Sequence, residues 1–162
     1  PIGVARESVA LVLFLFGSAA VIGLVLAGIF ADRFPRGALV VALLAIAIPV
    51  LTIGLAPGIP WIVFPALVLW SIGFGAAPPI LQTRMLHSTT KRIRDIAGAY
   101  LTTSFNIGIG MGALIGAILL DLVSIRALPF ADALLTFAAL AVFLVGDARL
   151  RRAQARQPAV RL

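Results

Sequence analysis

Gly28-Ile29-Phe30-Ala31-Asp32-Arg33-Phe34-Pro35-Arg36 is the stretch that decides the fold, because it sets three charges directly behind a long apolar segment. One carboxylate and two guanidinium groups are costly in hydrocarbon, so this stretch indicates a membrane–water boundary between two spans. An ordinary interfacial loop is one interpretation. The other is a gating loop, in which Asp32 bonds Arg33, Arg36 or a neighbouring helix N-terminus, and Gly28 admits a second helix at the same level.

The composition excludes a soluble globular protein. Hydrophobic residues make up 62% of the 162 residues and charged residues 12%, about half the charged share of a typical soluble domain. A soluble chain of this length could not bury so much apolar surface, whereas lipid solvates it. The net charge of +7 does not indicate a nucleic-acid binder, because the basic residues fall between and after apolar blocks.

Five apolar segments reach or approach the roughly 20 residues that a helix needs to cross a hydrocarbon core about 30 Å thick. They are residues 9–30, 38–56, 61–81, 96–120 and 128–145. The runs are continuous and do not alternate with period two, which favours helices over barrel strands. We predict an all-α, polytopic membrane protein with one membrane domain, residues 1–146, and a basic cytoplasmic tail, residues 147–162.

The basic residues indicate the direction of insertion. Two of them, Arg6 and Arg126, lie on one side of the predicted membrane, and eleven lie on the other side. The eleven are Arg33, Arg36, Arg84, Lys91, Arg92, Arg94, Arg149, Arg151, Arg152, Arg156 and Arg161. Because Lys and Arg are enriched in cytoplasmic loops, we expect a multi-pass protein of the cell inner membrane with its N-terminus outside and its C-terminus in the cytoplasm. The tail is either a topogenic segment near anionic headgroups or a specific lipid- or partner-binding motif.

The fourth span carries a row of glycines. Gly108, Gly112 and Gly116 recur every four residues and so lie one above another on a helix, which is typical of tight helix–helix packing. The letters from Gly108 to Ala113 also match a dinucleotide-binding fingerprint, but that fingerprint requires a strand before it and a helix after it. Asn106, just before the row, either makes an interhelical hydrogen bond or contacts a ligand in a central cavity.

The third span carries an aromatic pair. Trp70 and Phe74 are four residues apart and share a helix face, with Ser71 beside them. Three prolines in the same span remove backbone donors and can bend the helix. Trp70, Ser71 and Phe74 therefore either pack against lipid and helices or, together with Asn106, line a cavity.

Several kinds of chemistry have no residues to support them. The chain has no Cys and a single His, His87, which excludes thiolate sites and metal sites built on several histidines. All carboxylates fall at or near span ends, and no Ser/His or paired-aspartate constellation lies within a span. We therefore expect no enzymatic activity, no cofactor and no metal.

These motifs resemble the C-terminal half of a bacterial permease of the major facilitator superfamily (MFS), of the arabinose-efflux and drug:proton antiporter type. Gly28, Asp32, Arg33 and Arg36 match the repeat copy of the family's signature loop, although Pro35 stands where the pattern usually has Gly. The glycine run of residues 106–116 is similar to helix eleven. The resemblance identifies the five spans with helices eight to twelve, a partial MFS bundle.

This resemblance implies transmembrane transport by alternating access, in which two six-helix bundles rock around a central site. It implies efflux of a small molecule, a drug or a sugar, coupled to protons in the intact parent. The implied partners are membrane lipid, the substrate and an N-terminal six-helix half without counterpart here; nucleic acid is not among them. Because the chain begins at Pro1, we expect a fragment that transports little alone. The alternative is a small self-contained membrane scaffold or regulatory protein that acts through helix–helix packing.

Overall fold

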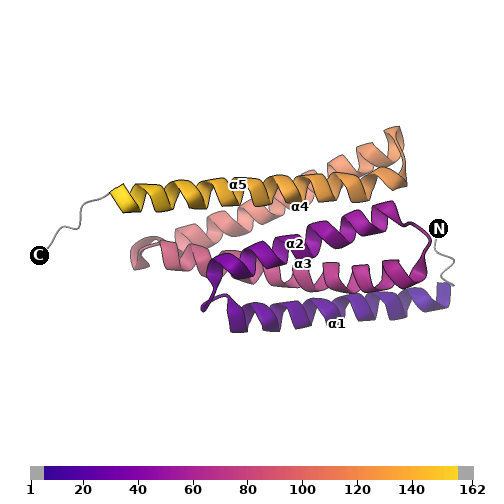
Figure 1. The fold of residues 1–162 in the computed structure, drawn as a ribbon, viewed down its shortest axis with the longest axis horizontal. Coiled ribbons are helices and arrows are strands. Elements are labelled where there is room, and N and C mark those ends of the chain that lie inside the picture. Colours follow the sequence, from indigo (N-terminus) through magenta and orange to yellow (C-terminus); the bar gives the residue numbers. More distant parts are fainter. Residues whose placement is uncertain (1–5, 157–162) are drawn as a thin grey trace, which may run out of the picture.

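Five long helices make up most of residues 6–156, the part of the chain that the computed structural model describes (Figure 1). They are α1 (Arg6–Phe30), α2 (Pro35–Leu55), α3 (Pro60–Ser88), α4 (Arg94–Leu122) and α5 (Leu128–Arg156). Short 3₁₀ turns, Lys91–Ile93 and Ile125–Ala127, precede α4 and α5. Residues 6–156 contain no strand, and all five helices are long and apolar enough to cross a membrane. The predicted all-α, five-span fold is confirmed.

The helices begin where local chemistry favours it and extend past the apolar runs. Pro35 and Pro60 stand at the starts of α2 and α3, where a missing N–H breaks no helical hydrogen bond. The three prolines inside α3 do not end it, and α3 continues beyond the predicted span 61–81 as far as Ser88. In the same way α5 runs through span 128–145 and into the segment expected to be a tail, as far as Arg156. The rest of that tail lies outside the described residues.

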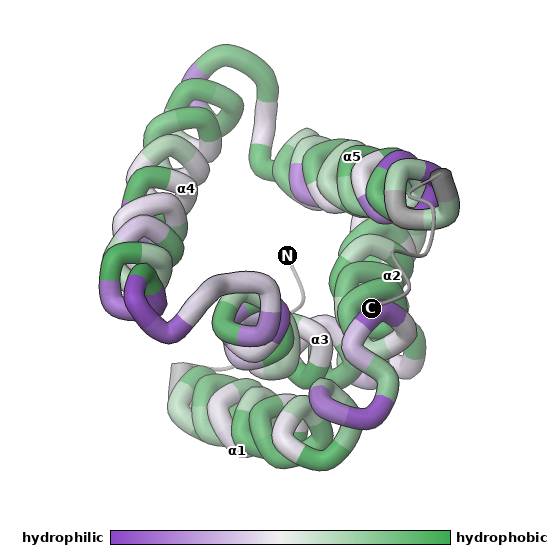
Figure 2. Tube along the Cα trace, turned by 90° about the vertical axis from the view of Figure 1, so that its left-hand side faces the viewer, coloured by the Kyte–Doolittle hydropathy of each residue, from purple (hydrophilic) through white to green (hydrophobic). Residues whose placement is uncertain are grey.

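The core lies where α3 passes between α1 and α2 (Figure 2). Its residues are small: Ala27 of α1, Ala42 of α2 and Ala76 of α3 are each less than a tenth exposed, and Ile46 and Ile80 fill the space between them. Small side chains let helix backbones approach closely, which is the main source of packing energy between helices in lipid. The helix α5 packs on the opposite side of α2.

Most large apolar side chains face outward, as expected of a protein dissolved in lipid. Phe14 of α1 is 71% exposed and Val142 of α5 is 73% exposed. Figure 2 shows that hydrophilic residues gather at the turns and at the end of α5 nearest the viewer, while the residues along the helices are mostly hydrophobic. The helix α4 stands apart from α1 and α2 and makes few contacts, with α3 and α5. The chain is therefore a multi-pass membrane protein with one loosely attached helix.

Candidate gating site and cavity wall

The signature loop, residues 28–36, is a tight turn between α1 and α2. Ala31 N–H donates to Ala27 O at 2.8 Å and Phe34 N–H donates to Phe30 O at 2.9 Å, so the chain reverses just before Pro35 begins α2. No side chain caps the N-terminus of α2. At Gly28, no described atom lies within 4 Å of the position that a Cβ would take. A second helix packed at Gly28 stays a prediction, and the open space there is what such a contact requires.

The charged groups of the signature loop do not pair with one another. Asp32 Oδ1 lies 4.0 Å from Nε2 of His87, near the end of α3, and the Asp32 side chain is 73% exposed. The Arg33 guanidinium lies 6.0 Å from the ring centre of Phe34. Arg36 turns toward α5. The loop is therefore joined to α3 by a long, solvent-exposed contact and to α5 by a shorter one.

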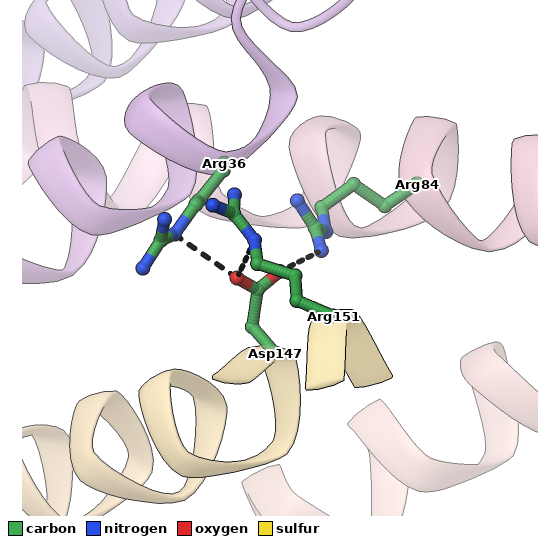
Figure 3. A network of polar contacts seen from close by, with 4 residues as sticks. All are labelled: Arg36, Arg84, Asp147 and Arg151. Atoms are coloured by element: carbon green, nitrogen blue, oxygen red, sulfur yellow. Dashed lines mark ion pairs between the residues drawn. The ribbon is translucent and has the colours of Figure 1, made fainter. Parts of the chain in front are cut away.

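Arg36 takes part in an ion-pair cluster that four side chains form at this end of the bundle (Figure 3). Asp147 Oδ2 lies 3.1 Å from Arg36 Nε and 3.0 Å from Arg151 Nε, and Asp147 Oδ1 lies 3.7 Å from Arg84 Nη2. The Asp147 side chain is only 14% exposed. Arg84 also stacks over the ring of Phe143, 4.8 Å from its centre. This arginine cluster (Arg36, Arg84, Asp147 and Arg151) joins the start of α2, the end of α3 and the end of α5.

Sequence reasoning missed Asp147, because the residue was assigned to a solvated tail. A signal was present. Ala133 and Leu140 are buried on α5, and Phe143 packs against the core. Asp147 follows at the same helical spacing of three and four residues, so it continues the buried face. An acidic residue that ends a buried face, at the membrane side holding eleven basic residues, would have indicated an ion pair.

A second feature is the close crossing of α1 and α3. A Cβ added at Gly23 would collide with the carbonyl oxygen of Ile72, and one at Gly75 with that of Ala20. Ser71 is fully buried in this crossing and its hydroxyl donates to Phe16 O at 2.5 Å. The structure thus places Ser71 between two helices and not on an open cavity wall.

Trp70 lines a groove between α1 and α3. The cavity measures about 370 Å³, and its walls include Phe16, Phe64 and Trp70 with no polar side chain besides the indole. The Phe16 and Trp70 rings are 5.3 Å apart, and Trp70 and Phe74 are 6.3 Å apart. Trp70 Nε1 is buried and has no hydrogen-bond partner among the described residues. This aromatic wall can stack against a flat apolar surface but offers few groups for hydroxyls.

The glycine row of α4 is open. No described atom lies within 4 Å of a Cβ at Gly108 or Gly112, and Gly116 meets only the end of Leu128, at 3.9 Å. Asn106 is exposed on the same helix, and its amide makes no hydrogen bond to any described residue. These residues do not meet Trp70 and Phe74 in one closed site. Packing at this row stays a prediction that needs a helix from outside the chain.

The profile of the Major Facilitator Superfamily matches residues 2–161, nearly the full chain. The chain belongs to the Major Facilitator Superfamily. The resemblance on which the sequence interpretation rested is confirmed, and it places the chain among transport proteins and not enzymes.

Two curated relatives add detail. A probable sugar efflux transporter of Helicobacter acinonychis (strain Sheeba) is 32% identical over 134 residues, which are 83% of this chain and 34% of the relative. A probable sugar efflux transporter of Helicobacter pylori (strain J99) is 32% identical over 130 residues, 80% of this chain and 33% of the relative. The chain therefore spans about a third of the length of the curated relatives it matches. No solved structure shows a significant match.

Proposed function

We propose that this chain is the part of an efflux permease that comprises helices eight to twelve, and that the intact parent exports a sugar-like small molecule. The observation that carries the proposal is its similarity to two probable sugar efflux transporters along most of its own length. A drug is the alternative substrate, which the apolar wall around Trp70 favours. A sugar's apolar face can stack on this wall, and the groups that bind its hydroxyls then come from the other half.

Alternating access is the proposed mechanism, with proton coupling in the parent. The signature loop and the arginine cluster act as its gating contacts at the arginine-bearing end, which we place in the cytoplasm with the N-terminus of the chain outside. Ion pairs suit this role because they can break and reform as the two halves rock, at a modest cost in a partly hydrated interface. The missing N-terminal six-helix half is the partner of the open glycine row. The five helices alone transport little.

A test is the efflux of a radiolabelled sugar from cells that produce the full-length parent. Asp32→Asn is expected to slow efflux by up to about fivefold, the effect of a change of up to about 1 kcal/mol in a gating equilibrium, while the amount of protein in the membrane stays constant. The matched control is Asp121→Asn. Asp121 is an exposed carboxylate near the C-terminal end of α4, away from the arginine-bearing end of the bundle. Equal efflux by the two variants would contradict a gating role for Asp32.

The second candidate is a self-contained scaffold that acts through helix packing, and the open face of α4 at Gly108 and Gly112 favours it. A stable, functional 162-residue product with no efflux partner would support that reading and contradict the transport proposal.

A further inference from the structure

A small, open cavity whose wall includes charged and polar residues lies at the arginine-bearing end, separate from the aromatic wall. It measures about 250 Å³ and is lined by Pro35, Arg84, His87 and Ser88. The last turns of α3 supply three of these residues, and the first residue of α2 supplies the fourth. We call it the basic pocket. Its position at the end of the spans places it at the level of the lipid headgroups.

The charges around the basic pocket favour an anion. Asp32 faces His87 at 4.0 Å, and Asp147 faces Arg84 at 3.7 Å. Against these two carboxylates stand four arginines: Arg33, Arg36, Arg84 and Arg151. Four positive and two negative charges leave a surplus of two, and the uncapped N-terminus of α2 adds the positive end of a helix dipole. A phosphate group is the anion that such a surplus at a membrane surface suits.

An apolar groove begins beside this pocket. It measures about 380 Å³ and lies between α1 and α2 with α3 as its floor. It runs from Phe34 and Gly37 at the turn to Ala45, about 16 Å along α2 at 1.5 Å per residue. All its lining residues are apolar. It exists because α1 and α2 barely touch each other although both pack on α3. A chain of methylene groups fits such a groove.

The two cavities are separate but lie one helical turn apart on α3, where Ile80 lines the apolar groove and Arg84 lines the basic pocket. Ile72, Ala76 and Ile80 lie on the floor of the apolar groove, and Arg84 and Ser88 line the basic pocket. Successive positions in this row are four residues apart and lie one turn above each other, while the row winds around α3 by about 40° per step. At the turn between α1 and α2, Phe34 lines the apolar groove and its chain neighbour Pro35 lines the basic pocket. A site for a phosphate group beside an apolar groove matches the headgroup and acyl chain of a phospholipid.

We propose that this combined site binds one anionic phospholipid, with its phosphate in the basic pocket and one acyl chain in the apolar groove. The site shares Pro35 and Arg84 with the proposed gating contacts, but it depends neither on the substrate nor on which side of the membrane the arginines lie. A lipid held there bridges α2 and α3 beside the arginine cluster.

The test is native mass spectrometry of the 162-residue chain released from detergent with equal amounts of phosphatidylglycerol and phosphatidylcholine. We expect one phosphatidylglycerol to be retained in preference to phosphatidylcholine. Ser88→Asp adds a negative charge to the pocket and is expected to weaken retention about fivefold, the usual effect of one charge near a membrane surface. Thr90→Asp adds the same charge to an exposed residue outside the pocket and should change retention little.

Two further variants, one of them with a matched control, probe the basic pocket and the apolar groove. Arg84→Gln should weaken retention like Ser88→Asp, whereas Arg92→Gln, an exposed arginine outside the pocket, should not. Gly37→Leu should fill the groove and weaken retention, because a Cβ there meets only Phe34, at 3.9 Å. Circular dichroism reports whether each variant folds. If Arg84→Gln unfolds, Ser88→Asp and Gly37→Leu decide the question, since both alter exposed positions.

Four outcomes measured on the 162-residue chain would overturn the proposal. They are equal retention of the two lipids, equal effects of Ser88→Asp and Thr90→Asp, displacement of the lipid by millimolar inorganic phosphate, and no effect of Gly37→Leu. The third outcome would mean a phosphate site without a lipid. Loss of phosphatidylglycerol binding in the full-length parent would mean that a helix of the parent fills the groove, and it too would contradict the proposal.

Discussion

Arg36 at the start of α2 pairs with Asp147 of α5, Nε to Oδ2 at 3.1 Å, and not with Asp32 of its own loop. The signature loop is thus connected to the last helix, and its carboxylate is left with an exposed contact to His87. The charged residues that the signature motif groups together fall into two separate interactions, which can be altered one at a time.

Asp147→Asn should lower the stability of the chain by about 1–2 kcal/mol. The change leaves three arginines around a neutral amide, and the cost stays below that of a fully buried pair because Arg36 and Arg151 are exposed. The thermal unfolding midpoint in detergent measures the loss. Asp121→Asn, exposed and without an ion pair among the described residues, should leave the midpoint unchanged. Equal midpoints for both variants would show that the cluster contributes no stability.

Gly23→Ala should destabilise the chain by about 1–3 kcal/mol, the usual cost of overpacking. The added Cβ would collide with the backbone of α3 at Ile72, which cannot move without separating the helices. Gly17→Ala, on the same helix, is the control, because its Cβ would meet no described atom within 4 Å. Urea- or heat-induced unfolding in detergent compares the two, and a Gly17→Ala variant as unstable as Gly23→Ala would contradict the crossing.

Gly112→Leu should not lower the unfolding midpoint of the isolated chain, because the space around Gly112 is open and leucine favours a helix more than glycine does. In the full-length parent the same change should reduce folded protein in the membrane, since a leucine would keep a partner helix from close approach. Fluorescence-detected size exclusion of both proteins gives the comparison. A parent that tolerates the leucine would mean that the glycine row faces lipid.

Single cysteines can test the proposed orientation, since the chain has no Cys. Thr90→Cys, in the connector before α4, should react with an impermeant maleimide only after the cytoplasmic side is opened. Pro57→Cys, between α2 and α3, should react in intact cells. Neighbouring Gly58 is unsuitable because its φ of +100° strains any other residue. The reverse labelling pattern would invert the topology.

The sequence by itself determined the five helices and the end of the bundle that carries charge. Both follow from a local requirement: a run of apolar residues in lipid must satisfy its own backbone hydrogen bonds, and charged side chains must reach water. The loop at residues 28–36 and the breaks near Pro35 and Pro60 could therefore be predicted from the sequence alone. The same reasoning indicated the family, because the signature loop is a local motif.

Only the tertiary structure decided which residues meet. The tight crossing uses Gly23 and Gly75, whereas Gly108 and Gly112 lie open in this chain. Spacing shows that a helix can pack closely and not which helix lies opposite. For Ser71 the sequence left packing and cavity lining open, and the hydroxyl lies buried against Phe16 O. Asp147 was assigned to a tail, whereas the packing of α5 on α2 turns it toward Arg36 and Arg84. The lipid environment requires each apolar run to form a helix by itself, but the pairing of helices depends on contacts between residues far apart in the chain.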